Sequence, residues 1–199
     1  MLNPASQWRT ELARQIATHY SAEAVMLVGS PVMGLANEYS DIDMLMYWHT
    51  IPTEAERVAI AQQLGGRITE LGDTSAEPKG DPALQSQSEA YVLGGHDLKI
   101  DITHITIASQ QKLIDDVVLR LETHPYKLGA IEGLPHCMAL IGHTLIKKWQ
   151  DEIRLLPDAL AHKLMRQYSQ MWAQRQLRDI LIRRGDVLYA NRALFDIAE

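Results

Sequence analysis

Two short groups of residues in the first quarter of the chain have types and spacing suited to binding a phosphate beside a divalent metal ion. The apolar run Ala24–Val28 ends in Gly29-Ser30, where a small residue lets the backbone approach a phosphate and where hydroxyl and N–H groups can donate to its oxygens. Asp41 and Asp43 follow at the start of a second apolar stretch, with Asp41 twelve positions after Gly29. Because residues two apart on a strand point to the same side, both carboxylates are expected to face one spot.

This pair of acids indicates a cation. Two carboxylates held close together repel each other unless a cation lies between them, and burying them in an apolar stretch without one costs several kcal/mol. Magnesium prefers oxygen ligands and often shares them with substrate phosphates. Taken alone, Gly29-Ser30 is typical of a turn, and the pair Asp41 and Asp43 is typical of a solvated strand edge or a helix cap. Their combination favours a metal-assisted phosphate site.

The elements that must position these groups can be predicted from the pattern of apolar and turn-forming residues. Apolar residues at four-residue spacing predict a helix over residues 6–20, and Thr53 with Glu56 forms a capping box for a helix ending near Leu64. Strands are expected at 24–28, 41–48, 89–93 and 98–107, with a hairpin turn at 94–97 and a long polar loop over 72–88. Further helices are expected over 109–122, from Pro135, from Pro157 to Arg184, and from Asp186 onward.

This order of elements is typical of an α+β protein. Residues 1–108 are expected to form one domain, a mixed sheet with flanking helices, and residues 109–199 a second domain, a C-terminal helical bundle. The last predicted helix lacks a C-terminal capping signal, which is the pattern expected of a truncated helical domain.

The composition is that of a globular chain and argues against several functions. Hydrophobic residues make up 46% of the 199 residues and charged residues 22%, a balance typical of folded proteins. The net charge is −6 and no block of Lys or Arg is present, so a protein that grips a long nucleic-acid backbone is not expected. The single cysteine, Cys137, excludes an internal disulfide, and no apolar stretch approaches the roughly 20 residues of a membrane span. We therefore expect a cytoplasmic protein.

The segment GSPVMGLANEYSDIDMLMYW resembles the signature of the DNA polymerase beta-like nucleotidyltransferase superfamily, which is Gly-Ser, a spacer, and then Asp-hydrophobic-Asp-hydrophobic. Within that superfamily it is most similar to small single-chain members, such as the aminoglycoside and lincosamide nucleotidyltransferases, and to uncharacterised relatives. The resemblance implies that residues 1–108 are a nucleotidyltransferase catalytic domain. Many members carry an arginine or tyrosine soon after Gly-Ser, whereas this chain has Pro31, Val32 and Met33. This chain therefore departs from the family where those members have a side chain able to contact the triphosphate.

The resemblance also implies a third carboxylate, on a later strand beside the first pair. Asp101 lies in the middle of the predicted strand 98–107, and its competitor Asp97 lies in the predicted turn. By spacing alone Asp101 is more typical of a structural or surface acid, but with the resemblance we interpret it as a metal ligand. Lys147 and Lys148 lie in a stretch similar to one where related transferases place a phosphate-binding lysine, although a solvated helix face explains them better.

The resulting hypothesis is a nucleotidyltransferase that moves an NMP from an NTP, such as ATP, to a hydroxyl of a small-molecule acceptor and releases pyrophosphate. Asp41, Asp43 and Asp101 are expected to hold two Mg²⁺ ions, with Asp101 a candidate general base, and Gly29 and Ser30 are expected to bind the nucleotide phosphates. Three alternatives stay open: a protein- or RNA-modifying nucleotidyltransferase, a non-catalytic nucleotide-binding or antitoxin-like module, and a purely structural domain. Nucleic acid and membrane partners are not expected, and the preferred NTP and the existence of a homodimer stay open.

Overall fold

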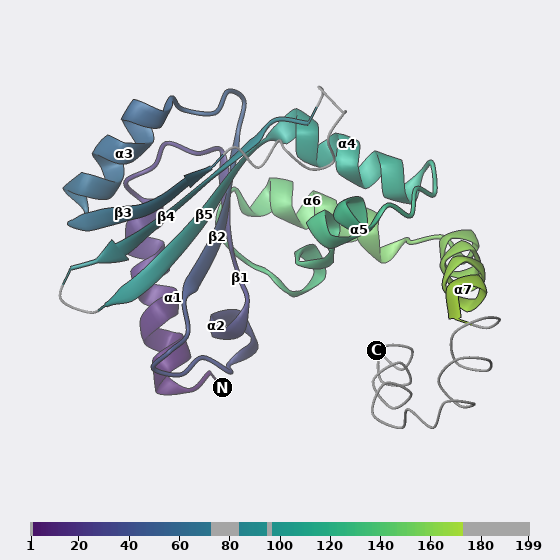
Figure 1. The fold of residues 1–199 in the computed structure, drawn as a ribbon, viewed down its shortest axis with the longest axis horizontal. Helices are drawn as coiled ribbons and strands as arrows, with labels where there is room; N and C mark the ends of the chain where they lie inside the picture. The colour runs from purple at the N-terminus through teal and green to yellow at the C-terminus, as the bar shows by residue number, and fades with distance from the viewer. Residues whose placement is uncertain (1, 73–83, 95–96, 173–199) are drawn as a thin grey trace, which may run out of the picture. The chain divides into compact units, whose positions relative to one another are not determined.

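The computed structural model describes residues 2–72, 84–94 and 97–172 of the 199-residue chain (Figure 1). The chain divides into two compact units, Met1–Leu156 and Pro157–Glu199. Every strand described below belongs to the first unit. The described part of the second unit contains helix α7, Asp158–Trp172. Among the described helices, none combines the length and the apolar character needed to cross a bilayer.

A six-stranded mixed sheet forms the centre of the first unit, with strand order β3-β4-β5-β2-β1-β6. Neighbouring strands are antiparallel except for β2 and β5, which are parallel. The bounds of the strands are β1 Ala24–Val28, β2 Ile42–Trp48, β3 Gly66–Gly72, β4 Ser86–Leu93, β5 Leu98–Thr106 and β6 Met138–Ile141. The sheet confirms the predicted α+β class.

Three helices of the first unit begin after residues whose side chains cap them. Asn3 accepts a hydrogen bond from the Ser6 N–H at 2.7 Å before the first helix, and the predicted capping box of Thr53 and Glu56 is present before the third. Thr106 caps the fourth helix in the same way. The bounds are α1 Pro4–Ala17, α2 Ser30–Met33, α3 Glu54–Gln63, α4 Ile107–Val118, α5 Pro125–Glu132, the 3₁₀ turn η2 Leu134–His136, and α6 His143–Arg154.

The two faces of the sheet have different surroundings. Helices α1 and α3 cover one face, here called the core face, while α4, α5 and α6 lie on the other side of the sheet (Figure 1). Alternation along β2 places Ile42, Met44 and Met46 on the core face, where all three are buried in one cluster with residues of α1 and α3. The residues between them point to the opposite face, here called the acid face because it carries Asp43 and Asp101.

Several predicted elements differ from those observed. Strands β3 and β6 were not predicted, and both lie at edges of the sheet, where β6 pairs with β1. The helix expected from Pro135 begins only at His143, because Pro135 lies in the 3₁₀ turn η2 and residues 138–141 join the sheet. Part of the predicted loop, 86–88, belongs to β4. The predicted helical segments beyond residue 172, which are residues 173–199 of the predicted C-terminal bundle, lie outside the described residues.

The first compact unit extends beyond the predicted domain boundary. Helix α4 begins at Ile107, directly after β5, and α4, α5 and α6 belong to the same unit as the sheet. The division of the chain into a catalytic domain of residues 1–108 and a helical domain of residues 109–199 therefore stays a prediction.

Candidate active site

Gly29 connects β1 to α2 and lies against the carboxylate of Asp43. Its backbone has φ 74° and ψ −156°, a combination that only glycine adopts readily. A Cβ atom at this position would lie 2.9 Å from Asp43 Oδ2. Gly29 is exposed and Ser30, the first residue of α2, is half-buried. The predicted phosphate loop and the predicted metal ligand are thus neighbours in the structure.

Asp43 and Asp101 are direct partners on the parallel strands β2 and β5. Because partners in register on adjacent strands point to the same face, both carboxylates lie on the acid face. Asp41 immediately precedes β2, and all three acids are half-buried. Burial raises the pKa of Asp43 above its ordinary value, and the carboxylates of Asp101 and Asp41 raise it further. The negative charges of Asp41 and Asp101 therefore both act on the carboxyl group of Asp43.

A lysine that was given no role from the sequence also belongs to this site. Lys99 Nζ lies 3.0 Å from Asp101 Oδ1, and about a third of each side chain is exposed. The hydrogen bond to Asp101 raises the pKa of Lys99, and the charges of Asp101, Glu70 and Asp41 act in the same direction. Its place could have been found from the sequence, since Lys99 is two residues before Asp101 and so shares its face of the strand.

The other candidate residues named from the sequence lie outside this cluster. Asp97, the competitor of Asp101, is exposed in the turn before β5 with φ 48°. Lys147 forms an ion pair with Asp151, and Lys148 lies 3.1 Å from Glu152 Oε1. Both lysine side chains are more than half exposed, at 56% and 55%. These contacts are those of a solvated helix face, so phosphate binding by either lysine has no support from its surroundings.

Asp41, Asp43 and Asp101, here called the acid cluster, offer carboxylate oxygens, and this donor chemistry fits a hard divalent cation. Within residues 2–72, 84–94 and 97–172, no group of three or more His, Cys, Asp or Glu side chains is arranged to hold a metal ion. The fit therefore rests on the carboxylate oxygens of Asp43 and Asp101 on adjacent strands, with the charge of Asp41 acting on the same spot. A site in which all three acids ligate Mg²⁺ stays a prediction.

The backbone of Gly29 provides a first test of this arrangement. Replacing Gly29 with Ala is expected to lower the free energy of unfolding by about 1–3 kcal/mol, because alanine is strained at this backbone conformation and its Cβ would press on Asp43. Gly129 in α5 is the matched control, since a Cβ there has no neighbour within 4 Å. Gly129→Ala is expected to raise the free energy of unfolding by about 0.5–1 kcal/mol. Urea unfolding measures both, and equal effects at the two glycines would contradict the steric account.

The raised pKa of Asp43 predicts a pH-dependent stability difference. A raised pKa means that the folded state binds this proton more tightly than the unfolded state, so ionising Asp43 destabilises the fold as the pH rises through the raised pKa. Asp43→Asn is therefore expected to match the wild type at pH 3, below the ordinary value of 3.8. At pH 7 it should be more stable, by about 1 kcal/mol or less because the carboxylate is only half-buried. Thermal unfolding across this pH range measures the difference.

The same measurement reports on metal binding. Millimolar Mg²⁺ at pH 7 is expected to raise the melting temperature of the wild type, because a cation that binds only the folded state stabilises it. The increase should be smaller in Asp43→Asn and in Asp101→Asn. An increase of equal size in all three proteins would mean that Mg²⁺ acts elsewhere.

Comparison with known proteins finds only distant likenesses. No protein-family model and no curated protein sequence matches the chain. Similar solved structures include a cytoplasmic RNA terminal U-transferase, with 15% identity over 67% of this chain and 40% of that chain and a TM-score of 0.35. They also include Cid1 in complex with the UTP analog UMPNPP, with 13% identity over 67% of this chain and 40% of that chain and a TM-score of 0.33. JHP933 from Helicobacter pylori has 11% identity over 88% of this chain and 100% of that chain, with a TM-score of 0.31.

The chain thus spans about 40% of the length of the U-transferase and Cid1 chains that it matches. At these low identities and TM-scores, the function of the chain is inferred from its own site residues.

Proposed function

We propose that the chain is a metal-dependent nucleotidyltransferase of the DNA polymerase beta-like superfamily, which transfers an NMP from an NTP to a hydroxyl acceptor. The observation that carries this proposal is the contact of three separate segments at one spot. The backbone of Gly29 lies against Asp43, and Asp43 lies beside Asp101 on the neighbouring parallel strand. A purely structural domain has no packing reason to bring a backbone conformation open only to glycine and two carboxylates together on a half-buried face.

The residues of this chain have distinct roles in the proposed reaction. Gly29 and Ser30 bind phosphate oxygens of the triphosphate through backbone N–H groups and the hydroxyl. Asp41, Asp43 and Asp101 would hold Mg²⁺, and ions bound there would supply positive charge against the phosphates and acidify the acceptor hydroxyl. Lys99 forms an ion pair with Asp101 and so offsets the negative charge of that carboxylate.

The chemical step is an in-line displacement at the α-phosphorus. The acceptor oxygen forms a bond to the α-phosphorus while the bond from that phosphorus to the bridging oxygen of the β-phosphate breaks, and pyrophosphate leaves with that oxygen. Asp101 accepts the proton of the acceptor hydroxyl. The chain contributes position and charge, which are the main sources of catalysis in phosphoryl-transfer chemistry.

A small molecule is the acceptor that the overall charge favours. The net charge of −6, without a block of basic residues, does not complement a long phosphate backbone. The end of an RNA or a protein side chain is the alternative acceptor, and a nucleotide-binding module without turnover is the alternative from outside the enzymes.

A transfer assay tests the proposal. The protein is incubated with Mg²⁺ and each of the four NTPs labelled at the α-phosphate, together with a panel of small hydroxyl compounds, a short RNA and a protein mixture. The expected result is transfer of label to one acceptor class with stoichiometric pyrophosphate release. Tight NTP binding without release under every condition would instead favour the non-catalytic module.

A further inference from the structure

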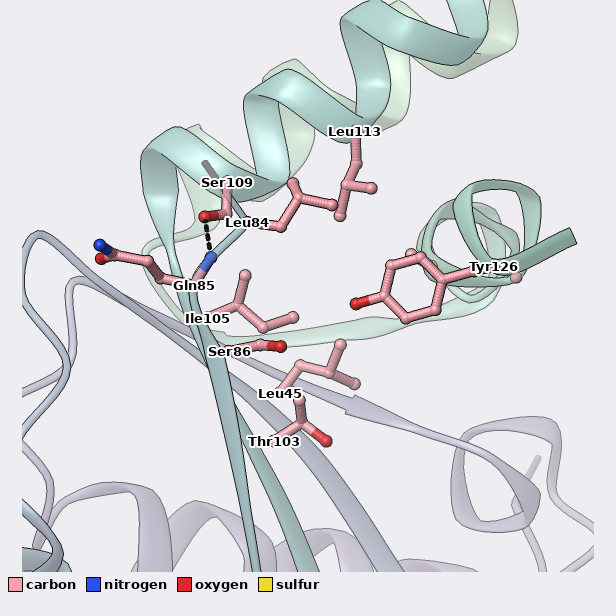
Figure 2. A pocket seen from close by; sticks show the side chains of 11 residues that line it. Leu45, Leu84, Gln85, Ser86, Thr103, Ile105, Ser109, Leu113 and Tyr126 are labelled. Atoms are coloured by element: carbon pink, nitrogen blue, oxygen red, sulfur yellow. Dashed lines mark hydrogen bonds between the residues drawn. The ribbon is translucent and has the colours of Figure 1, made fainter. Parts of the chain in front are cut away.

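A cavity of about 370 Å³ lies on the acid face, between the sheet and helices α4 and α5 (Figure 2). Its floor is formed by side chains of β2, β5 and β4, and its roof by side chains of α4 and α5. The lining residues are Leu45, Leu84, Gln85, Ser86, Thr103, Ile105, Ser109, Leu113, Tyr126, Gly129 and Ala130. This volume lies within the roughly 300–1,000 Å³ typical of small-molecule sites.

Among the residues that the structure describes, those that line the cavity carry no formal charge. None of these eleven residues is Asp, Glu, Lys, Arg or His, and the only ionisable group among them is the phenol of Tyr126. Leu45, Ile105 and Leu113 give the cavity an apolar body, and Thr103 and Tyr126 contribute hydroxyls, with the Tyr126 ring directed towards the cavity (Figure 2). The hydroxyl of Ser109 accepts a hydrogen bond from the Gln85 N–H at 2.8 Å. A charged group held among these residues would lose much of its hydration without gaining an ion of opposite charge.

The cavity adjoins the acid cluster along the two parallel strands. Leu45 is two residues after Asp43 on β2, and Thr103 is two residues after Asp101 on β5, and these pairs are in register. Residues two apart share a face and lie about 7 Å apart along a strand. A molecule in the cavity can therefore place a terminal group at Asp101 while its body contacts Leu45 and Thr103.

The geometry of in-line displacement decides which substrate the cavity can hold. The attacking oxygen and the leaving pyrophosphate lie on opposite sides of the α-phosphorus. Gly29, proposed above to bind the leaving phosphates, follows β1, whereas the cavity lies over β2, β5 and β4. In the strand order β3-β4-β5-β2-β1-β6, these positions lie on opposite sides of Asp43. The acceptor hydroxyl is therefore expected to approach the α-phosphorus from the side on which the cavity lies.

We propose that this cavity binds the acceptor, and that the acceptor is an uncharged small molecule with an apolar body and a terminal hydroxyl. The inference rests on the proposed nucleotidyltransferase function and names its substrate class. The inference argues against a polycationic acceptor such as an aminoglycoside, because none of the described lining residues offers a carboxylate to its several ammonium groups.

The charge preference can be measured with three probes that share the phenylbutanol skeleton. Phenylbutanol is compared with two derivatives that keep its terminal hydroxyl and carry on the ring a group that is cationic (aminomethyl) or anionic (carboxylate) at pH 7. In ligand-observed NMR titrations of the full chain, we expect phenylbutanol to bind at least about tenfold more tightly than either ion, because only the ions are desolvated without compensation. Equal or tighter binding of either ion would overturn the proposal.

A space-filling variant locates the binding of the probe. Gly129 is an exposed lining residue, and a Cβ added there has no neighbour within 4 Å, so Gly129→Phe adds a ring at the wall of the cavity without a steric clash at Cβ. We expect phenylbutanol binding to weaken at least about tenfold in this variant, since the apolar contact area is lost. Gln62→Phe, on an exposed position of α3, is the matched control and should leave binding unchanged. Circular dichroism and the melting temperature confirm that both variants fold.

Calorimetry with Mg²⁺ and ATP distinguishes the acceptor from the nucleotide. ATP binding retained in Gly129→Phe supports the acceptor assignment. Loss of ATP binding in that variant would mean that the cavity holds the nucleobase, and loss of binding to a short RNA would mean that it holds an RNA end. Either result overturns the proposal and leaves the nucleotidyltransferase function standing. Failure of that function has a different signature, namely a wild type that binds none of the four NTPs, and it overturns both.

Discussion

Asp43→Asn is expected to lower metal-dependent pyrophosphate release by about a thousandfold or more while the fold is retained. The substitution keeps the size of the side chain and removes the charge that faces Asp101 and the Gly29 backbone. Loss of a single preorganised electrostatic contact to a transition state costs about 10²- to 10³-fold in rate, and a metal ligand supports several such contacts. The measurement is the initial rate of pyrophosphate release with saturating NTP and acceptor.

The control for this loss is another Asp→Asn change. Asp97 is exposed in the turn before β5, and its φ of 48° is one that Asn adopts readily. Asp97→Asn should therefore retain the rate of the wild type, and Asp101→Asn should lose it as Asp43→Asn does. The mechanism would be contradicted if Asp43→Asn kept a near-normal metal-dependent rate, or if the change at Asp97 were equally damaging.

The parts of the site that were predictable from the sequence are those encoded by short-range spacing. Asp41 and Asp43 stand two apart at the start of an apolar strand, and Gly29 follows another, so alternation and turn chemistry were sufficient to identify them. The capping box at Thr53 and Glu56 was predictable for the same reason, because both partners lie within one helical turn.

The pairing of strands was not predictable in the same way. Which strand lies beside β2, and in what register, depends on contacts between segments more than 50 residues apart. Spacing alone therefore did not place Asp101 beside Asp43; the resemblance to the nucleotidyltransferases implied it, and the structure gives the register. Strand β6 was missed because its four residues are too few to show alternation, and its place is set by pairing with β1. The cavity was missed because its lining comes from five separate elements.

A buried ionic cluster on the core face also had no signal in the sequence. Glu89 lies in β4 with its side chain fully buried, and Arg57 Nε lies 3.2 Å from its Oε2. The hydroxyl of Tyr20 donates to Glu89 Oε1 at 2.8 Å. Nε2 of His104 lies 3.5 Å from the same oxygen, which is a weak electrostatic contact, while Trp48 donates to Nδ1 of this histidine at 3.1 Å. The cluster joins the segment that follows α1, helix α3 and strands β2, β4 and β5, on the face of the sheet opposite the acid cluster.

The charge states in this cluster follow from its contacts. Burial alone would raise the pKa of Glu89, but His104, the Tyr20 hydroxyl and the charge of Arg57 together hold it below the ordinary value. Burial lowers the pKa of His104, and the nearby Arg57 charge acts in the same direction. The ionised pair in the core is therefore Glu89 with Arg57, and His104 is neutral at pH 7.

Glu89→Ala is expected to lower the free energy of unfolding by about 3–5 kcal/mol at pH 7, because it leaves the Arg57 guanidinium buried without its counter-charge. A domain of ordinary stability, about 5–15 kcal/mol, would lose much of its margin. The depressed pKa of Glu89 means that its contribution is present above the unfolded-state pKa and is lost as the pH falls through the folded-state pKa. The gap between wild type and variant should therefore narrow on acidification, as measured by urea unfolding at several pH values.

The double variant Glu89→Leu with Arg57→Met distinguishes the net stability that the ion pair contributes from the cost of leaving the Arg57 guanidinium buried without its partner. Replacing both partners by apolar residues of similar volume removes the uncompensated guanidinium, so the double variant should be more stable than Glu89→Ala. Because the cluster lies on the core face, opposite Asp43 and Asp101, these variants should also bind Mg²⁺ with wild-type affinity under conditions where they remain folded. A stability loss below about 1 kcal/mol in Glu89→Ala would contradict this account, because a buried charge without a partner costs more than that.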